Sequence, residues 1–152
     1  METETGIVVE LVRKARVKTI EILHAVPEHA LYETHPPCDR TFTHTFLHIA
    51  EGEEGWLYGA FEDGGPKPEF IDYDVQRDRM GILLALERSH QRMLAWIAAH
   101  PSELTKPLAG WARGKPALDR VVYLIGHEVN HQTQILHGLQ RLGLEWDIFM
   151  PF

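Results

Sequence analysis

The feature that most constrains the fold is a helical period that runs through four long stretches of the chain. In each stretch apolar residues recur every three or four positions, with charged residues between them. Segments rich in proline and glycine separate the stretches. The pattern predicts four amphipathic helices, at about Gly6–Val26, Thr41–Phe61, from a cap at Asp72 or Asp74 to Pro101, and from Pro116 to Gly143.

The connections between these stretches indicate how the helices are arranged. Residues 27–39 and 101–116 are expected to be loops, and Gly64-Gly65-Pro66-Lys67-Pro68 ends the second helix before an extended segment. This second connection is about a dozen residues long, enough to travel the length of a helix at about 3.3 Å per residue. We therefore predict an all-α fold, a four-helix bundle of up-down-down-up order, as a single domain over residues 1–152.

Composition narrows the class of protein. A chain of 152 residues, 44% hydrophobic and 24% charged, is long enough for one domain with a real core. The net charge of -7 and the absence of a Lys/Arg cluster argue against a nucleic-acid partner. Because Cys38 is the single cysteine and no apolar run approaches a signal core or a membrane span, we expect a cytoplasmic protein without a membrane partner.

The ten histidines carry the strongest functional signal. His127 and His131 are four residues apart in the last predicted helix, so both imidazoles lie on one helical face, as in half of a metal site. In the second predicted helix His44 and His48 have the same spacing, and their face also carries glycines, at positions Gly52, Gly55 and Gly59. Glycines weaken a helix, so they indicate either room for a ligand or close helix approach, or an exposed and frayed helix with solvated histidines.

The same residues spell a known motif. His127-Glu-Val-Asn-His131 matches H-E-x-x-H, in which two histidines bind zinc and the glutamate, here Glu128, is the general base of a protease. His137 even stands where a longer form of the motif has a third histidine. That form needs a glycine turn, but Gln134 occupies the position within a continuous helical pattern, so His137 would point away from His131. A zinc protease is therefore the less favoured interpretation.

Two segments resemble the DinB/YfiT-like proteins. The segment from Gly126 to Gly143 is similar to the last helix of that family, in which two histidines four apart are followed by Gln-Ile and a terminal Leu-Gly. The family's usual Arg-Gly after the second histidine is Gln132-Thr133 here. The segment from Phe46 to Leu57 resembles the family's second helix, in which a histidine precedes an acidic run with an aromatic residue.

This resemblance implies a metal site with three histidine ligands, His48, His127 and His131, and leaves His44 as an alternative ligand. Three neutral imidazoles suit a divalent ion such as zinc or nickel and leave a position open for water or substrate. Glu51 and Glu128 are candidates for orienting an imidazole or moving a proton, although we expect each to lie on a solvated helix face.

The resemblance also implies a reaction class. It suggests a metal-dependent transferase or hydrolase that acts on a small molecule, using a low-molecular-weight thiol or metal-bound water. Two alternatives stay open, a non-catalytic, stress-linked protein that binds a metal or small ligand, and a structural bundle whose histidines bind nothing.

The remaining polar and aromatic residues are predicted to have structural roles. His90 is expected to be a hydrogen-bonded core histidine, and His24, His29, His35 and His100 are expected to be solvated. Trp56 and Trp111 could line a pocket, although tryptophan in a bundle is usually in the core. The apolar tail from Trp146 to Phe152 is expected to pack across the bundle or against a second subunit, which favours a homodimer.

Overall fold

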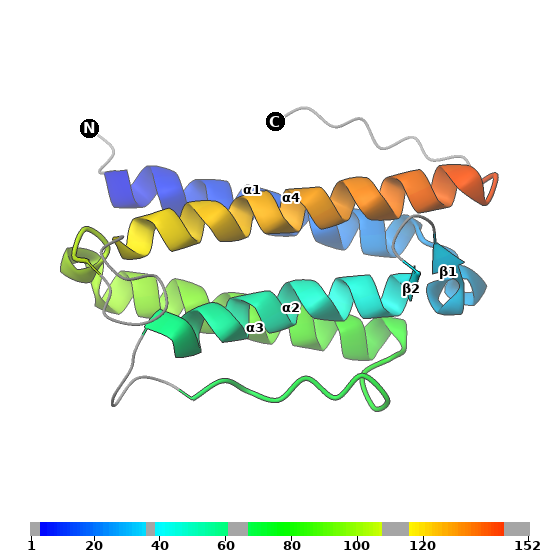
Figure 1. The fold of residues 1–152 in the computed structure, drawn as a ribbon, viewed down its shortest axis with the longest axis horizontal. Helices are drawn as coiled ribbons and strands as arrows, with labels where there is room; N and C mark the ends of the chain where they lie inside the picture. The colour runs from blue at the N-terminus through cyan, green and yellow to red at the C-terminus, as the bar shows by residue number, and fades with distance from the viewer. Residues whose placement is uncertain (1–3, 36–38, 61–66, 108–115, 145–152) are drawn as a thin grey trace.

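A computed structural model describes residues 4–35, 39–60, 67–107 and 116–144. Within these ranges the chain forms four long helices, α1 (Glu4–Ala25), α2 (Phe42–Ala60), α3 (Arg79–Ala99) and α4 (Ala117–Arg141). They lie side by side as one bundle (Figure 1). The prediction of an all-α four-helix bundle is confirmed.

Side-chain contacts give the directions of the helices. Glu53 of α2 contacts Ser89 of α3, and Glu54 contacts Arg92. Residue numbers therefore increase in the same direction along α2 and α3, which run parallel. Contacts from α2 to α4 run the opposite way, because His48 lies beside His131, while Gly52, four residues later, lies beside His127. As Figure 1 shows, α1 and α4 therefore run in one direction and α2 and α3 in the other.

Residues 67–78, which precede α3, run back along α2 (Figure 1). The Glu69 backbone N–H donates to Glu54 Oε2 at 2.7 Å, and further along the segment Thr43 Oγ1 donates to the Arg77 carbonyl at 3.0 Å. Glu69 thus lies beside the second half of α2 and Arg77 beside its first turn, just before α3 begins. This path brings Tyr73 over the outer face of α2, beside the histidines.

The predicted start of the third helix was wrong. Asp78 caps α3 by accepting the Gly81 backbone N–H at 2.7 Å. Asp72 instead accepts the backbone N–H groups of Asp74 and Val75, at 3.0 and 3.1 Å, and so closes a separate turn. An aspartate that bonds forward to backbone N–H groups has the same local signature in a turn and at a helix cap, so the pattern could not separate the two.

The segment after α1, expected to be a loop, holds short elements. A 3-10 helix, η1 (Glu28–Tyr32), follows Pro27, and β1 (Thr34–His35) pairs antiparallel with β2 (Arg40–Thr41). Strands of two residues are too short to show a period in the sequence. A second 3-10 helix, η2 (Pro101–Glu103), follows α3.

The expectation that His35 is solvated was also wrong, because β1 carries its side chain into the bundle. His35 is fully buried, stacks on Phe42 with ring centroids 4.4 Å apart, and places Nε2 2.9 Å from Thr45 Oγ1. Gly138 of α4 makes room for it, since a Cβ there would lie 2.6 Å from His35 Cβ. The ring therefore fills space between β1, α2 and α4.

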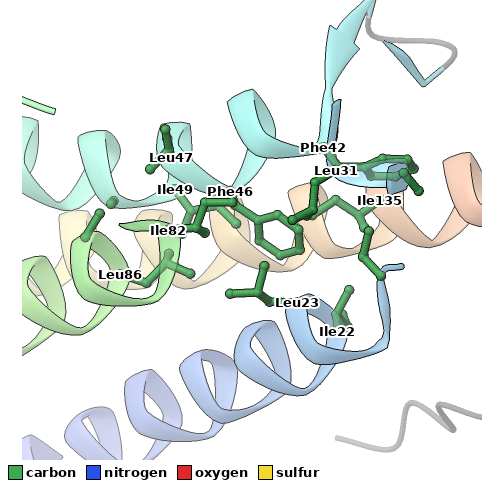
Figure 2. Packing of buried hydrophobic residues seen from close by; sticks show 14 of the residues in the cluster. Ile22, Leu23, Leu31, Phe42, Phe46, Leu47, Ile49, Ile82, Leu86 and Ile135 are labelled. Carbon is green, nitrogen blue, oxygen red and sulfur yellow. The ribbon is translucent and has the colours of Figure 1, made fainter. Parts of the chain in front are cut away.

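Apolar side chains in the described ranges form two clusters, one toward each end of the bundle. One cluster surrounds Phe42 and Phe46 and includes Ile22, Ile82 and Ile135 (Figure 2). The other, at the opposite end, contains Trp56, which is 1% exposed and packs edge-on against Trp96. Trp56 is therefore a core residue.

Between the two apolar clusters lies a buried polar layer. Its side chains come from all four long helices and hydrogen-bond to one another; they are Arg16, Thr19, Glu53, Ser89, His90, Glu128 and Gln132. His90 is 5% exposed and places Nδ1 3.2 Å from Glu53 Oε1, as expected of a hydrogen-bonded core histidine.

Two further expectations bear on location and assembly. Among the helices in the described ranges, no segment has both the length and the apolar character needed to cross a bilayer. Cys38 and Trp111 lie outside the described residues. The tail at 146–152, on which the homodimer expectation rests, also lies outside them.

Candidate metal centre

Three histidines converge where α2 packs against α4. His48 of α2 faces His127 and His131 of α4, and their possible ligand atoms all lie within 4.8 Å of one another. His127 Nε2 is 3.3 Å from His48 Nε2 and 3.1 Å from His131 Nε2. The structure therefore brings together the three residues that the resemblance implied. His44 lies apart from this cluster, since its exposed ring packs against Tyr73 with centroids 4.5 Å apart.

The spacing of these nitrogens fits a shared metal ion. Zinc–imidazole bonds of about 2.0–2.1 Å place two ligand nitrogens about 3.3 Å apart in tetrahedral geometry, and about 3.0 Å apart at right angles. The observed separations of 3.3 and 3.1 Å fall in this range. The rings also stand at steep angles to one another, 63° to 86°, as rings do when they approach one centre from different sides.

Hydrogen bonds at the far side of two rings fix their tautomers. His48 Nδ1 lies 3.1 Å from Glu51 Oε2, and His131 Nδ1 lies 2.7 Å from Gln134 Oε1. In the neutral form of each ring the proton therefore lies on Nδ1, where it is donated to these oxygens, and Nε2 presents a lone pair to the cluster. A proton on His127 Nε2 could be donated to only one of these two lone pairs. A cation at the centre satisfies all three nitrogens, so the donor set fits a metal.

Local electrostatics favour the neutral form of the two α4 histidines, which metal coordination requires. Burial, together with the neighbouring His131 and His48, lowers the pKa of His127 to about 4. Burial lowers the pKa of His131 as well, the hydrogen bond that its ring donates to Gln134 works against this, and nearby His48 and Arg40 act in the same direction as burial. At neutral pH both imidazoles of α4 therefore have lone pairs free for coordination.

The pKa of His127 predicts how the stability of the metal-free protein depends on pH. An unfolded histidine titrates near pH 6.5, so between pH 6.5 and 4 the unfolded chain binds more protons than the folded one. The free energy of unfolding should stay level above pH 6.5 and fall as the pH drops below it. We expect a loss of about 1–2 kcal/mol by pH 4.5 from this residue, a value reduced because the ring is partly in water.

Urea unfolding in chelator at several pH values between 7.5 and 4.5 measures this slope. His127→Gln should flatten it in part, whereas His137→Gln, at an exposed position of the same helix, should leave it unchanged. An identical slope in wild type and His127→Gln would contradict the assignment.

Gly52 makes room for His127, which explains one of the unusual glycines of α2. A Cβ at this position would lie 3.0 Å from His127 Cε1 and 3.2 Å from Nδ1, tighter than ordinary contact. At Gly55 nothing lies within 4 Å. Gly52 therefore allows α2 to approach α4 closely at the site, whereas Gly55 does not have this role.

This difference predicts opposite outcomes for two matched substitutions. Gly52→Ala should displace the His127 ring by a few tenths of an ångström and weaken metal binding about tenfold, as changes beside a ligand commonly do. Gly55→Ala should leave metal affinity unchanged and raise the free energy of unfolding by about 0.5–1 kcal/mol through helix propensity. Competition with a chromophoric chelator measures the affinities, and equal values in both variants would refute this role of Gly52.

Glu128 does not lie at the metal centre, and the expectation that it is solvated was wrong. It is 4% exposed and points toward α1, where its carboxylate accepts Arg16 Nε at 2.9 Å. Adjacent residues of a helix point about 100° apart, so His127 and Glu128 face different neighbours. His137 is exposed and stands apart from the cluster. The protease interpretation therefore has neither its general base nor its third ligand.

Glu51, unlike Glu128, lies beside the histidine cluster. Its carboxylate contacts His48 and also accepts the Tyr73 hydroxyl at 2.9 Å, on the solvent side of the cluster. Burial and the bond to Glu51 raise the pKa of Tyr73, so the phenol stays protonated and remains a donor. Glu51 is exposed, as expected, and orients an imidazole.

A comparison with known protein families identifies the family of this chain. The family model described as the DinB superfamily matches residues 11–135. The chain belongs to the DinB superfamily. All three clustered histidines fall inside the matched residues of this DinB-superfamily protein, so the resemblance carried by their motifs is confirmed at the level of the family. No curated protein matches the chain.

Two hydrogen-bond partners around the histidine cluster, Gln134 and Tyr73, are not predicted from the sequence. In the sequence Gln134 is notable only as the residue that replaces a glycine in the protease motif. Gln134 could have been found, because it lies three residues after His131 just as Glu51 lies three residues after His48, a spacing that places side chains together on a helix. Tyr73 lies on an irregular segment and had no such signal.

Proposed function

We propose that this DinB-superfamily protein binds a divalent metal ion, zinc or nickel, through His48, His127 and His131. The observation that carries the proposal is the convergence of three Nε2 atoms, two of them fixed as acceptors by Glu51 and Gln134. Imidazole nitrogen is a preferred ligand of both metals. No fourth His, Cys, Asp or Glu in the described ranges joins the cluster, which leaves a position for another molecule.

We further propose that the site is catalytic, as a transferase or hydrolase acting on a small molecule. When bound, the ion would supply Lewis acidity that lowers the pKa of a low-molecular-weight thiol or of water in the open position. The chain's own residues would orient the site. Glu51 accepts a hydrogen bond from His48 Nδ1, and the Tyr73 hydroxyl donates to Glu51. The Tyr123 ring stacks beside His127, with 6.2 Å between ring centroids.

Location and assembly remain part of the proposal. A net charge of -7 and the single cysteine Cys38 are compatible with a cytoplasmic protein that has no nucleic-acid partner. The apolar sequence of the tail at 146–152 is the support for a homodimer. Sedimentation of the full chain tests the dimer.

A thiol-dependent turnover assay tests the catalytic proposal. Protein loaded with zinc or nickel is mixed with 1-chloro-2,4-dinitrobenzene as electrophile and with cysteine, glutathione or coenzyme A as thiol, and an activated ester without thiol tests the hydrolase arm. We expect turnover that requires metal and falls at least about 100-fold in His131→Ala but not in His137→Ala. Turnover that survives in His131→Ala would remove the cluster from the reaction. Metal binding without any turnover would favour the alternative, a stress-linked binding protein.

A further inference from the structure

The β1–β2 hairpin carries an arginine at one end of the α2–α4 contact that holds the histidine cluster. Arg40 of β2 pairs with His35 of β1, and the His35 ring lies against Gly138 of α4. Gly138 follows His131 by two turns on the same face of α4, about 10 Å along the helix axis. On the other side, β2 leads directly into the first turn of α2 (Figure 1). The hairpin is therefore within reach of the cluster for a side chain as long as arginine.

The guanidinium of Arg40 acts on three side chains around the cluster. Burial lowers the pKa of His44 and of His131, and the positive charge of Arg40 lowers both further. The same charge works against burial and Glu51, which raise the pKa of Tyr73. A single charge affects three separate groups in this way only when it lies close to each of them. Arg40 thus lies beside one metal ligand, His131, and beside the His44–Tyr73 ring pair on the solvent side of α2.

This cation has no partner of its own among the described residues. Arg40 is exposed, and its guanidinium makes no hydrogen bond or ion pair with any of them. Glu51, the carboxylate beside His48, is already engaged by His48 and by the Tyr73 hydroxyl. Three neutral imidazoles leave the charge of a divalent ion unbalanced. An open ligand position and an unpaired guanidinium thus lie at the same mouth, and both favour an anionic group.

We propose that Arg40 recognises an anionic group on the small molecule that occupies the open position of the metal centre. Within the thiol chemistry proposed above, on which this inference rests, the substrate class is a small thiol that carries a carboxylate a few bonds from its sulfur. The sulfur takes the open position as its proton passes to solvent, and the carboxylate accepts hydrogen bonds from the Arg40 guanidinium. A hydroxyl in place of the carboxylate gains no ion pair, and an ammonium is repelled. Arg40 is therefore a specificity-determining residue.

A binding titration of the full chain loaded with cobalt(II) tests this inference separately from turnover. Uptake of cobalt is measured first, and a thiol that binds the cobalt is then followed by its charge-transfer absorption. Mercaptoacetate, 3-mercaptopropionate and 4-mercaptobutyrate are each compared at pH 7.5 with the mercapto-alcohol of the same length. We expect at least one acid to bind at least about fivefold more tightly than its alcohol. Equal affinities at all three lengths would overturn the proposal.

Variants of exposed arginines show whether the preference comes from Arg40 or from a carboxylate that binds the metal itself. Arg40→Gln should reduce the preference for the acid to less than about twofold, and Arg40→Lys, which keeps the charge, should retain part of it. Arg13→Gln removes an exposed arginine of α1, on the far side of the bundle, and should keep the full preference. A preference that persists in Arg40→Gln would overturn the role of Arg40. Failure of the wild-type protein to take up cobalt would instead contradict the metal centre.

Discussion

Arg16→Ala is expected to lower the free energy of unfolding by about 3–5 kcal/mol, the largest loss predicted for any single side chain of this bundle. Arg16 is 3% exposed, and its guanidinium pairs with Glu53 of α2 and Glu128 of α4. Although burial works against its charge, the two carboxylates raise the pKa of Arg16 above its ordinary value. Removing the guanidinium leaves two carboxylates facing each other away from water.

Urea unfolding at pH 7.5 measures this loss. Arg13→Ala is the matched control, because Arg13 lies nearly one turn earlier on α1 but is exposed, and its removal should change the free energy by less than about 0.5 kcal/mol. Adding Glu53→Gln and Glu128→Gln to Arg16→Ala should recover part of the loss, since the uncompensated charges are then removed. A loss below about 1 kcal/mol in Arg16→Ala would contradict the account of this layer.

His127→Ala is expected to abolish the stabilisation that the metal gives to the fold. Zinc at about 100 times its dissociation constant should stabilise the wild-type protein by about 2.7 kcal/mol, which for a chain of this size raises Tm by roughly 5–10 °C. His127 Nε2 is the nitrogen that contacts both other clustered histidines, so its loss leaves no complete donor set. The Tm of His127→Ala should therefore be almost the same with and without zinc.

Differential scanning fluorimetry with zinc and with chelator measures both shifts. His137→Ala, which changes an exposed histidine of the same helix, is the control and should keep the full wild-type shift. A zinc-dependent rise in Tm that survives in His127→Ala but is lost in His137→Ala would place the metal elsewhere.

The fold could be predicted because each long helix buries a regular apolar face. In α2, for example, the buried residues Phe42, Phe46 and Ile49 recur every three or four positions, and this period is visible in the sequence before any contact is known. Helix ends depend on single hydrogen bonds instead. Asp72 and Asp78 make similar side-chain bonds to the backbone, yet only Asp78 begins a helix, so the start of α3 was misplaced.

The candidate site could be predicted in part. The spacing of His127 and His131 places both rings on one face of α4. The same spacing in α2 does not decide whether His44 or His48 is the third ligand. Residues four apart in a helix differ by about 6 Å along its axis, and only the register between α2 and α4 decides which of them meets His127. In the structure that residue is His48, while His44 meets Tyr73.

The buried layer could not be predicted from local pattern. Arg16 and Glu128 are 112 positions apart, and a charged residue is ordinarily taken to be solvated unless its partner is known. Glu128 was therefore expected on a solvated face. Long-range pairing of this kind follows from the packing of α1 against α4, which a helical period alone does not specify.

Metal content of the purified full chain, expressed without a histidine tag, tests the central claim most directly. Mass spectrometry of the wild-type protein and of His44→Ala should find about one equivalent of zinc or nickel per chain, while His48→Ala, one helical turn away, should retain less than about a tenth. Less than about a tenth of an equivalent in the wild-type protein, or equal content in His44→Ala and His48→Ala, would contradict the three-histidine metal centre.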